Sequence, residues 1–98
     1  KILRYENGGK YKWHTDCGAR ETSLRKLTAI VQLSDETKYE GGNLEFGITD
    51  KSGKNNYTAP RTRGSITIFP SFLSHRVTPV TKGKRYSLIT WMLGDCFV

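Results

Sequence analysis

The stretch "KRYSLITWML", residues 84–93, decides the fold, because its side chains alternate in a regular period of two. Such alternation predicts a β-strand. One face of this strand carries Arg85, Ser87, Ile89, Trp91 and Leu93, and the other carries Tyr86, Leu88, Thr90 and Met92. Both faces are largely apolar, so we expect both to be covered. An arginine that points toward a core needs an anion there, which makes Arg85 a candidate binding residue.

The same short period recurs along the whole chain, and no segment shows the three-and-four recurrence of a long helix. The pattern predicts strands at residues 1–5, 11–15, 24–33, 43–46, 57–59, 65–69, 75–78 and 84–93. Turn signals such as "NGG", "SDE", "EGG" and "TKGK" separate these strands. Eight short strands at this spacing favour a barrel or a sandwich.

Length and composition indicate one small globular domain spanning residues 1–98, with a modest core. No apolar run approaches the ~20 residues that a membrane span needs, and the N-terminus lacks a signal-peptide pattern. Cys17 and Cys96 are too few for a disulfide framework, so we expect reduced thiols. These features predict a cytoplasmic protein with no membrane contact.

The net charge of +7 would attract nucleic acid or another acidic partner. Much of the excess lies in residues 51–63 and 81–85. A nucleic-acid module more often interleaves its basic residues with exposed aromatic side chains. A solvated basic surface is therefore the favoured interpretation, and nucleic acid is a second-choice partner.

The stretch "WHTDCG", residues 13–18, places His14 and Asp16 two positions apart. In a strand these side chains project from the same side, so both can converge on one ion. A second imidazole would complete the two-histidine, one-carboxylate set that leaves positions open on ferrous iron, and His75 is the only other histidine. Taken alone, the triplet more often marks an ordinary surface turn after a strand than a metal site.

The order and spacing of several segments resemble the iron(II)- and 2-oxoglutarate-dependent dioxygenases, and within them the prolyl 4-hydroxylase-like branch. The matching segments are "YENGGKYKWHTD" (5–16), "RKLTAIVQLS" (25–34), "YEGGNLEF" (39–46), "PRTRGSITIFPS" (60–71) and "HRVTPVTKGKRYSLITW" (75–91). The resemblance implies an all-β fold, a double-stranded β-helix of the jelly-roll or cupin-like kind. We expect a minimal form with few or no flanking helices, in which an exposed apolar face would favour self-association.

The resemblance also implies roles for individual residues. His14, Asp16 and His75 would bind iron and form the catalytic centre. Arg85 would pair with the distal carboxylate of 2-oxoglutarate, since a guanidinium presents a planar fork to a carboxylate, and Tyr5 would donate its hydroxyl to the same group. The alternative for Arg85 is an internal salt bridge to Glu45 or Asp95.

Weaker assignments concern the pocket wall and its mouth. Tyr11 and Trp91 would line the cofactor pocket, although aromatic residues at strand spacing belong to a core more often than to a site. Thr28 and Ser87 are further candidates for cosubstrate contact. The segments "CGARETS" (17–23) and "GITDKSGKNNYTAPRTR" (47–63) are expected to cover the mouth of the barrel.

The function implied by the resemblance is Fe(II)- and 2-oxoglutarate-dependent hydroxylation of a peptidyl substrate, with a prolyl residue as first choice. Succinate and CO2 would be released, O2 would be consumed, and ascorbate would serve as reductant. One alternative applies the same chemistry to a nucleic acid or a free amino acid. Another is a basic β-barrel that binds without catalysis, in which His14 and His75 would not meet.

Overall fold

The structure is a computed structural model that describes residues 1–17, 24–47 and 57–94. These residues form nine strands and one short 3-10 helix, η2 (Glu36–Lys38). The strands are β1 (Ile2–Glu6), β2 (Tyr11–His14), β3 (Arg25–Gln32), β4 (Tyr39–Gly41), β5 (Leu44–Phe46), β6 (Tyr57–Thr58), β7 (Ile66–Pro70), β8 (His75–Val77) and β9 (Val80–Leu93). The predicted all-β class is confirmed. In the described ranges, no helix has the length and apolar character needed to cross a membrane.

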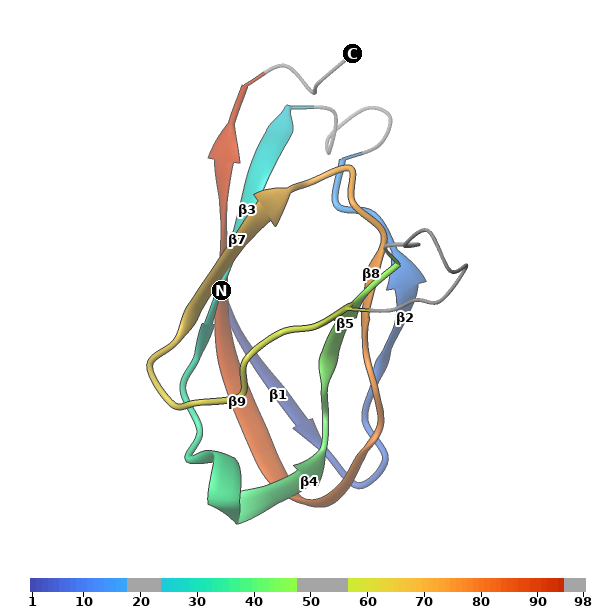
Figure 1. Cartoon of the computed structure of the whole chain (residues 1–98), viewed down its shortest axis with the longest axis vertical. Coiled ribbons are helices and arrows are strands. Elements are labelled where there is room, and N and C mark those ends of the chain that lie inside the picture. Colours follow the sequence, from blue (N-terminus) through green and yellow to red (C-terminus); the bar gives the residue numbers. More distant parts are fainter. Residues whose placement is uncertain (18–23, 48–56, 95–98) are drawn as a thin grey trace.

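The strands form two antiparallel sheets that face each other (Figure 1). The larger sheet has the order β1-β9-β3-β7, with β4 paired to the first part of β9, and the smaller sheet has the order β2-β8-β5-β6. Apart from β4, which pairs with β9, and β6, which pairs with β5, successive strands along the chain alternate between the two sheets. This alternation is typical of a double-stranded β-helix, the fold that the family resemblance implies.

The core lies between the two sheets and is built from inward-facing side chains of both. Ile30 and Ile89 come from the larger sheet, and Phe46 comes from the smaller one. The rings of Phe46 and Phe69 meet edge to face, with centroids 4.8 Å apart. Burial of each such side chain contributes about 1.5–3 kcal/mol, so this cluster holds the two sheets together.

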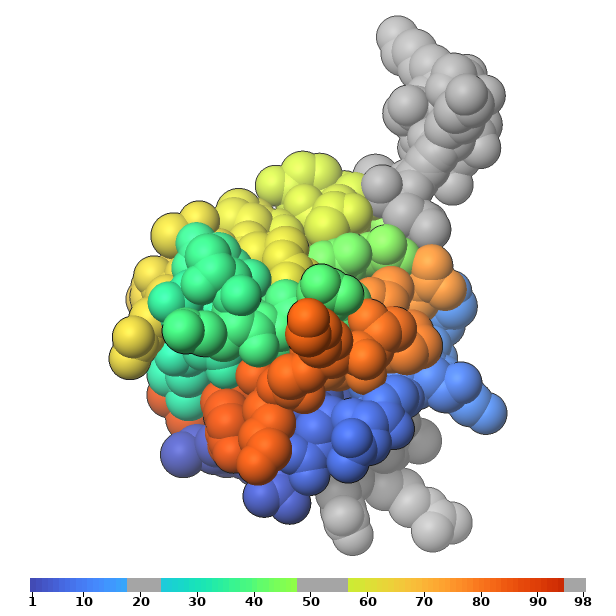
Figure 2. Space-filling view, turned by 90° about the horizontal axis from the view of Figure 1, so that it is seen from below, coloured from blue at the N-terminus to red at the C-terminus, as the bar shows by residue number. Residues whose placement is uncertain are grey.

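Two of the predicted turn signals lie at least partly in strands, because β4 includes Glu40 and Gly41 of "EGG" and β9 includes the whole of "TKGK". The "TKGK" segment is not a turn, because β9 begins at Val80 and runs through it. Gly83 has a φ of +75° and pairs with Tyr39 of β4, a strand that the sequence did not predict. A Cβ at this position would collide with the Lys38 carbonyl oxygen, so glycine permits the close approach of the two chains. Figure 2 shows the first part of β9 lying beside the green segment that contains β4.

The expectation that both faces of the last strand are covered is wrong for the outer face. Met92 there is 44% exposed, and Ile66 and Ile68 of β7 are 61% and 59% exposed. Cross-strand pairing places Val31 between Leu88 and Ile66, so an apolar row crosses the larger sheet. In the described structure, the outer face of this sheet is therefore an exposed apolar surface.

Two further expectations concern segments near the ends of the described ranges. Cys17 is disulfide-bonded and none of the described cysteines is free, so the expectation of a reduced thiol at Cys17 is wrong. Cys96 lies outside the described residues. Of the two segments expected to cover the barrel mouth, 17–23 and 47–63, residues 18–23 and 48–56 also lie outside the described residues.

Candidate active site

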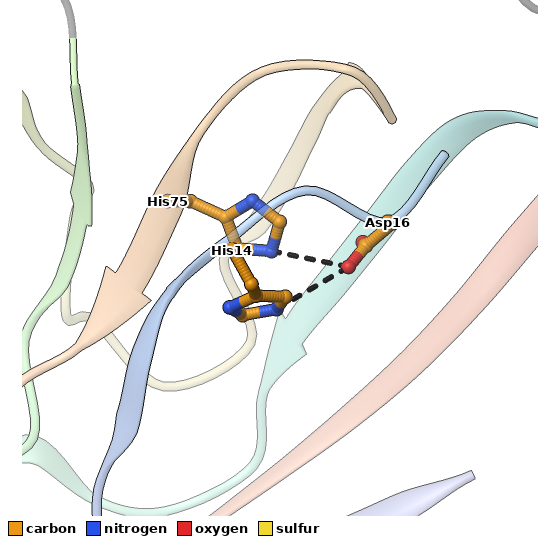
Figure 3. A group of neighbouring side chains, drawn as sticks. All are labelled: His14, Asp16 and His75. Atoms are coloured by element: carbon orange, nitrogen blue, oxygen red, sulfur yellow. Dashed lines mark ion pairs between the residues drawn. The ribbon is translucent and has the colours of Figure 1, made fainter. Parts of the chain in front are cut away.

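Three side chains meet at one point, two of them on neighbouring strands of the smaller sheet and the third just after the first of these strands. His14 ends β2, His75 begins β8, and the two are direct cross-strand partners. Asp16 follows two residues after His14, and its Oδ1 lies 3.3 Å from Nε2 of His14 and 3.4 Å from Nε2 of His75 (Figure 3). One potential ligand atom from each residue lies within 4.8 Å of the others, so the group could hold a metal ion.

Backbone carbonyl groups fix the orientation of both imidazoles. Nδ1 of His14 lies 2.7 Å from the Lys12 carbonyl oxygen, and Nδ1 of His75 lies 2.8 Å from the Leu73 carbonyl oxygen. A carbonyl oxygen can only accept a hydrogen bond, so Nδ1 carries the proton in each ring. Nε2 of each neutral ring therefore offers a lone pair toward Asp16, which is the arrangement common in metal-binding histidines.

The Asp16 carboxylate is 6% exposed and its two oxygens have different surroundings. Oδ1 faces the imidazoles, whereas Oδ2 accepts hydrogen bonds from Thr28 Oγ1 at 2.7 Å and from Trp91 Nε1 at 3.2 Å. Burial alone would raise the pKa of Asp16, but the nearby imidazoles and the Thr28 hydroxyl outweigh it and hold that pKa well below its usual range. The carboxylate is therefore ionised at neutral pH.

The three side chains fit a divalent transition metal by two criteria. Two imidazole nitrogens and one carboxylate oxygen form a donor set suited to ferrous iron. In the described structure, Nε2 of His75 is buried and has no hydrogen-bond partner, although a buried polar atom normally has one. Burial would lower the pKa of His14, but the contacts with Asp16 and the Lys12 carbonyl oxygen outweigh it and raise that pKa. A proton and a metal ion would therefore compete for the Nε2 atom of His14.

A cavity of about 110 Å³ opens beside this group. All seven predicted site residues line it, namely Tyr5, Tyr11, His14, Asp16, His75, Arg85 and Trp91, and so does Ser87. Tyr11 is 47% exposed and stacks on His14 with centroids 3.8 Å apart. The structure thus brings together, around one cavity, residues that the sequence spreads from position 5 to position 91.

Arg85 supplies a buried positive charge to the same cavity. Its side chain is 1% exposed, its Nη2 donates to Gln32 Oε1 at 3.2 Å, and its Nε has no partner among the described residues. Burial lowers the pKa of Arg85 from its ordinary value, because the charged guanidinium loses its favourable contact with water. The alternative of a salt bridge to Glu45 is wrong, since Glu45 pairs with Arg76 at 2.7 Å. Asp95, the other alternative partner, lies outside the described residues.

Tyr5 and Gln32 flank this guanidinium. The Tyr5 ring centroid lies 5.3 Å from Cζ of Arg85, and burial raises the Tyr5 pKa, so its hydroxyl keeps its proton. Gln32 was missed in the sequence, where "IVQL" reads as a core segment. The same alternation that turns Thr28 and Ile30 inward also turns Gln32 inward, and a buried polar residue in that series is the signal that could have found it.

Comparisons with known proteins agree with this architecture. The chain is 34% identical over 91 residues to a PKHD-type hydroxylase of Synechococcus sp. strain CC9605, covering 93% of this chain and 40% of that protein. It is 37% identical over 93 residues to a PKHD-type hydroxylase of Shewanella oneidensis, covering 91% of this chain and 40% of that protein. The chain thus spans about 40% of the length of these curated relatives.

Solved structures show the same fold. A Pseudomonas putida prolyl-4-hydroxylase superposes with a TM-score of 0.79 at 24% identity, covering 97% of this chain and 51% of that one. A Phytophthora capsici prolyl 4-hydroxylase superposes with a TM-score of 0.75 at 26% identity, covering 96% of this chain and 31% of that one. The family model of the 2OG-Fe(II) oxygenase superfamily matches residues 1–93. The chain belongs to this superfamily.

Proposed function

We propose that the chain forms the iron- and 2-oxoglutarate-binding part of an oxygenase that hydroxylates a prolyl residue in a peptide or protein. One observation carries the proposal. A group that could hold a metal, His14, Asp16 and His75, and a buried, incompletely bonded guanidinium, Arg85, line one cavity. Iron bound by His14, Asp16 and His75, together with a dicarboxylate that reaches Arg85, would satisfy both sets of polar groups.

Each residue has a separate task in this proposal. His14, Asp16 and His75 hold Fe(II), and the carboxylate lowers the net charge of the centre. Arg85 binds the distal carboxylate of 2-oxoglutarate, and the protonated Tyr5 hydroxyl donates to the same group. When bound, iron and 2-oxoglutarate supply the oxidative chemistry, in which O2, cosubstrate and substrate yield succinate, CO2 and a hydroxylated product.

The remaining cavity residues orient the site and limit its access to water. Tyr11 covers one face of His14 at the mouth, and Trp91 packs beside Asp16. Ser87 is 1% exposed and adds a hydroxyl to the wall between Arg85 and Ile89. Ile30 and Ile89 make the same wall apolar, and this strengthens the pairing of a carboxylate with Arg85.

The choice of a prolyl substrate rests on the relatives. The Phytophthora capsici protein, at 26% identity, is a prolyl 4-hydroxylase, and the Synechococcus and Shewanella relatives are hydroxylases. The non-catalytic alternative requires His14 and His75 to lie apart, whereas they are cross-strand partners. Ascorbate enters the proposal only as an external reductant that keeps the iron ferrous.

The test is a coupled assay with Fe(II), 2-oxoglutarate and ascorbate on a panel of proline-containing peptides. Succinate formation and a gain of one oxygen atom on the peptide are measured by mass spectrometry in the same samples. We expect both signals in equal amount, and both should be lost in His14→Ala and His75→Ala. The matched control is Arg76→Met, which removes an arginine that contacts Glu45 and does not line the cavity.

The outcomes separate chemistry from substrate choice. Succinate formed with no peptide oxidation would support the cosubstrate chemistry and reject the prolyl peptides of the panel. Oxidised oligonucleotide or free amino acid in a parallel panel would then identify the alternative substrate class. Unchanged turnover in both histidine variants would reject the proposed metal ligands.

A further inference from the structure

The two oxygens of the Asp16 carboxylate are held by different parts of the barrel. Oδ1 faces the imidazoles of the smaller sheet, whereas Oδ2 is bonded to Thr28 and Trp91 of the larger sheet. Asp16 is therefore the residue at the site whose carboxylate contacts side chains of both sheets.

The two donors come from one register position of the larger sheet. Thr28 on β3 and Trp91 on β9 are direct cross-strand partners, so their side chains project side by side toward the same oxygen. Thr28 is 0% exposed and its hydroxyl also lies 2.9 Å from Ser71 Oγ. A hydroxyl has one proton, so Thr28 donates to Asp16 and accepts from Ser71, and the chain of bonds strengthens each member.

The backbone on either side reinforces this arrangement. The Ser71 carbonyl oxygen accepts hydrogen bonds from the backbone N–H groups of Asp16 at 2.8 Å and Cys17 at 3.0 Å. On the cavity side, Cζ of Arg25 lies 3.8 Å from the centroid of the Trp91 ring, a stacking contact that restrains the indole. Main chain and side chain of Asp16 are thus both fixed from the larger sheet.

We propose that Thr28 and Trp91 are positioning residues that keep Asp16 a ligand through Oδ1 alone. This inference rests on the proposed function. A carboxylate with two unengaged oxygens can bind a metal through either one or both. With Oδ2 engaged by two donors, only Oδ1 is available, so the carboxylate occupies one coordination position and leaves others open for cosubstrate and O2.

The magnitude expected for such outer contacts is known. Loss of a hydrogen bond to a metal-ligating side chain weakens metal binding by about 10- to 100-fold. The effect is distinct from loss of packing, which lowers the stability of the metal-free chain without changing the metal affinity of the folded state. Both quantities therefore have to be measured for each variant.

The experiment compares Thr28→Val and Trp91→Phe with the parent chain by Co(II) titration, followed by visible absorption, and by thermal unfolding without metal. Thr28→Val keeps the shape and removes the hydroxyl, whereas Thr28→Ser restores a donor. Trp13→Phe is the matched control for the indole, because Trp13 is 40% exposed and stacks on Arg76 away from the cavity. His75→Ala tests the metal site itself.

We expect Thr28→Val and Trp91→Phe each to bind Co(II) at least about 10-fold more weakly than the parent and to show a changed absorption band. Thr28→Ser and Trp13→Phe should bind Co(II) like the parent. Parent-like Co(II) affinity in Thr28→Val and Trp91→Phe, with weak binding in His75→Ala, would overturn this inference and leave the proposed function standing. A parent chain that binds no Co(II), or a His75→Ala chain that binds like the parent, would overturn both. A lower unfolding temperature with unchanged affinity would assign the two residues a purely structural role and overturn the inference.

Discussion

His14 and His75 stand opposite each other on neighbouring strands, and their ring centroids are 4.1 Å apart. Two imidazolium ions at this separation would repel each other strongly in a partly buried site. Such repulsion is avoided when the two Nε2 atoms, which both face Asp16, share one cation. Metal binding requires both rings to be neutral, so metal and protons compete for the same Nε2 atoms.

Acidification is expected to release the metal. The His14 pKa is raised above its ordinary value of 6.5, so the loss of affinity should begin at a higher pH than for an isolated imidazole. Asp16 does not contribute in this range, because its pKa is held far below 3.8. Co(II) affinity measured between about pH 5 and pH 8 should fall steadily toward the acidic end. An affinity that is flat across this range would contradict a site made of two imidazoles.

The metal-free chain should respond to pH in the opposite sense. Because the folded-state pKa of His14 is raised, its stabilising contribution is fully present below 6.5 and is lost as the pH rises through the folded-state pKa. The contribution of Asp16 has the reverse sign and is lost only as the pH falls below 3.8.

We therefore expect the Tm of the chain in chelator to decrease from about pH 6 to about pH 8, and the Tm with Co(II) to increase over the same interval. Differential scanning calorimetry in the two conditions checks this. His14→Ala serves as the control, since its metal-free Tm should lose this part of the pH dependence. A metal-free Tm that rises with pH in the parent would contradict the predicted sign.

Arg85 should favour cosubstrate binding at the expense of stability. A buried charge with an unsatisfied Nε is costly, and an apolar side chain of similar length removes the cost. We expect Arg85→Met to raise the Tm of the ligand-free chain or leave it unchanged, and to abolish the Tm increase produced by 2-oxoglutarate with metal. Arg76→Met, which breaks the ion pair to Glu45 outside the cavity, should retain that increase. Loss of the 2-oxoglutarate response in both variants would argue against a specific role for Arg85.

Much of the fold could be predicted because alternation is a local property. The period of two places Arg85, Ser87 and Ile89 on the inner face, where the structure has them. The "TKGK" segment was misassigned because a glycine with positive φ is as compatible with a close strand crossing as with a turn. The choice between them depends on β4, which lies far away in the sequence.

The proposed metal ligands could be suggested from the spacing of His14 and Asp16, but the contribution of His75 depends on the register of β2 with β8. Register is a long-range property, and a shift by one residue would turn His75 to the other side of its strand. The hydrogen bonds of Thr28 and Trp91 to Asp16 were not foreseen for the same reason. They require two sheets to be placed against each other, which no local pattern specifies.

Gly42 should be required for the placement of Arg85. It has a φ of +63°, and a Cβ there would lie 2.8 Å from Val80 Cγ2 and 2.9 Å from Arg85 Cδ. Gly64 is the matched control, because its φ of +86° carries a similar backbone strain but a Cβ there meets nothing within 4 Å. Both alanine variants should lose about 1–2 kcal/mol of stability from the positive φ.

Only Gly42→Ala should also displace the Arg85 side chain, and it should weaken 2-oxoglutarate binding about tenfold or more, measured by calorimetry with metal present. Gly64→Ala should bind 2-oxoglutarate like the parent. Equal affinity in the two variants would show that the guanidinium tolerates a shift at Cδ, and that the position of Arg85 is set instead by its bond to Gln32.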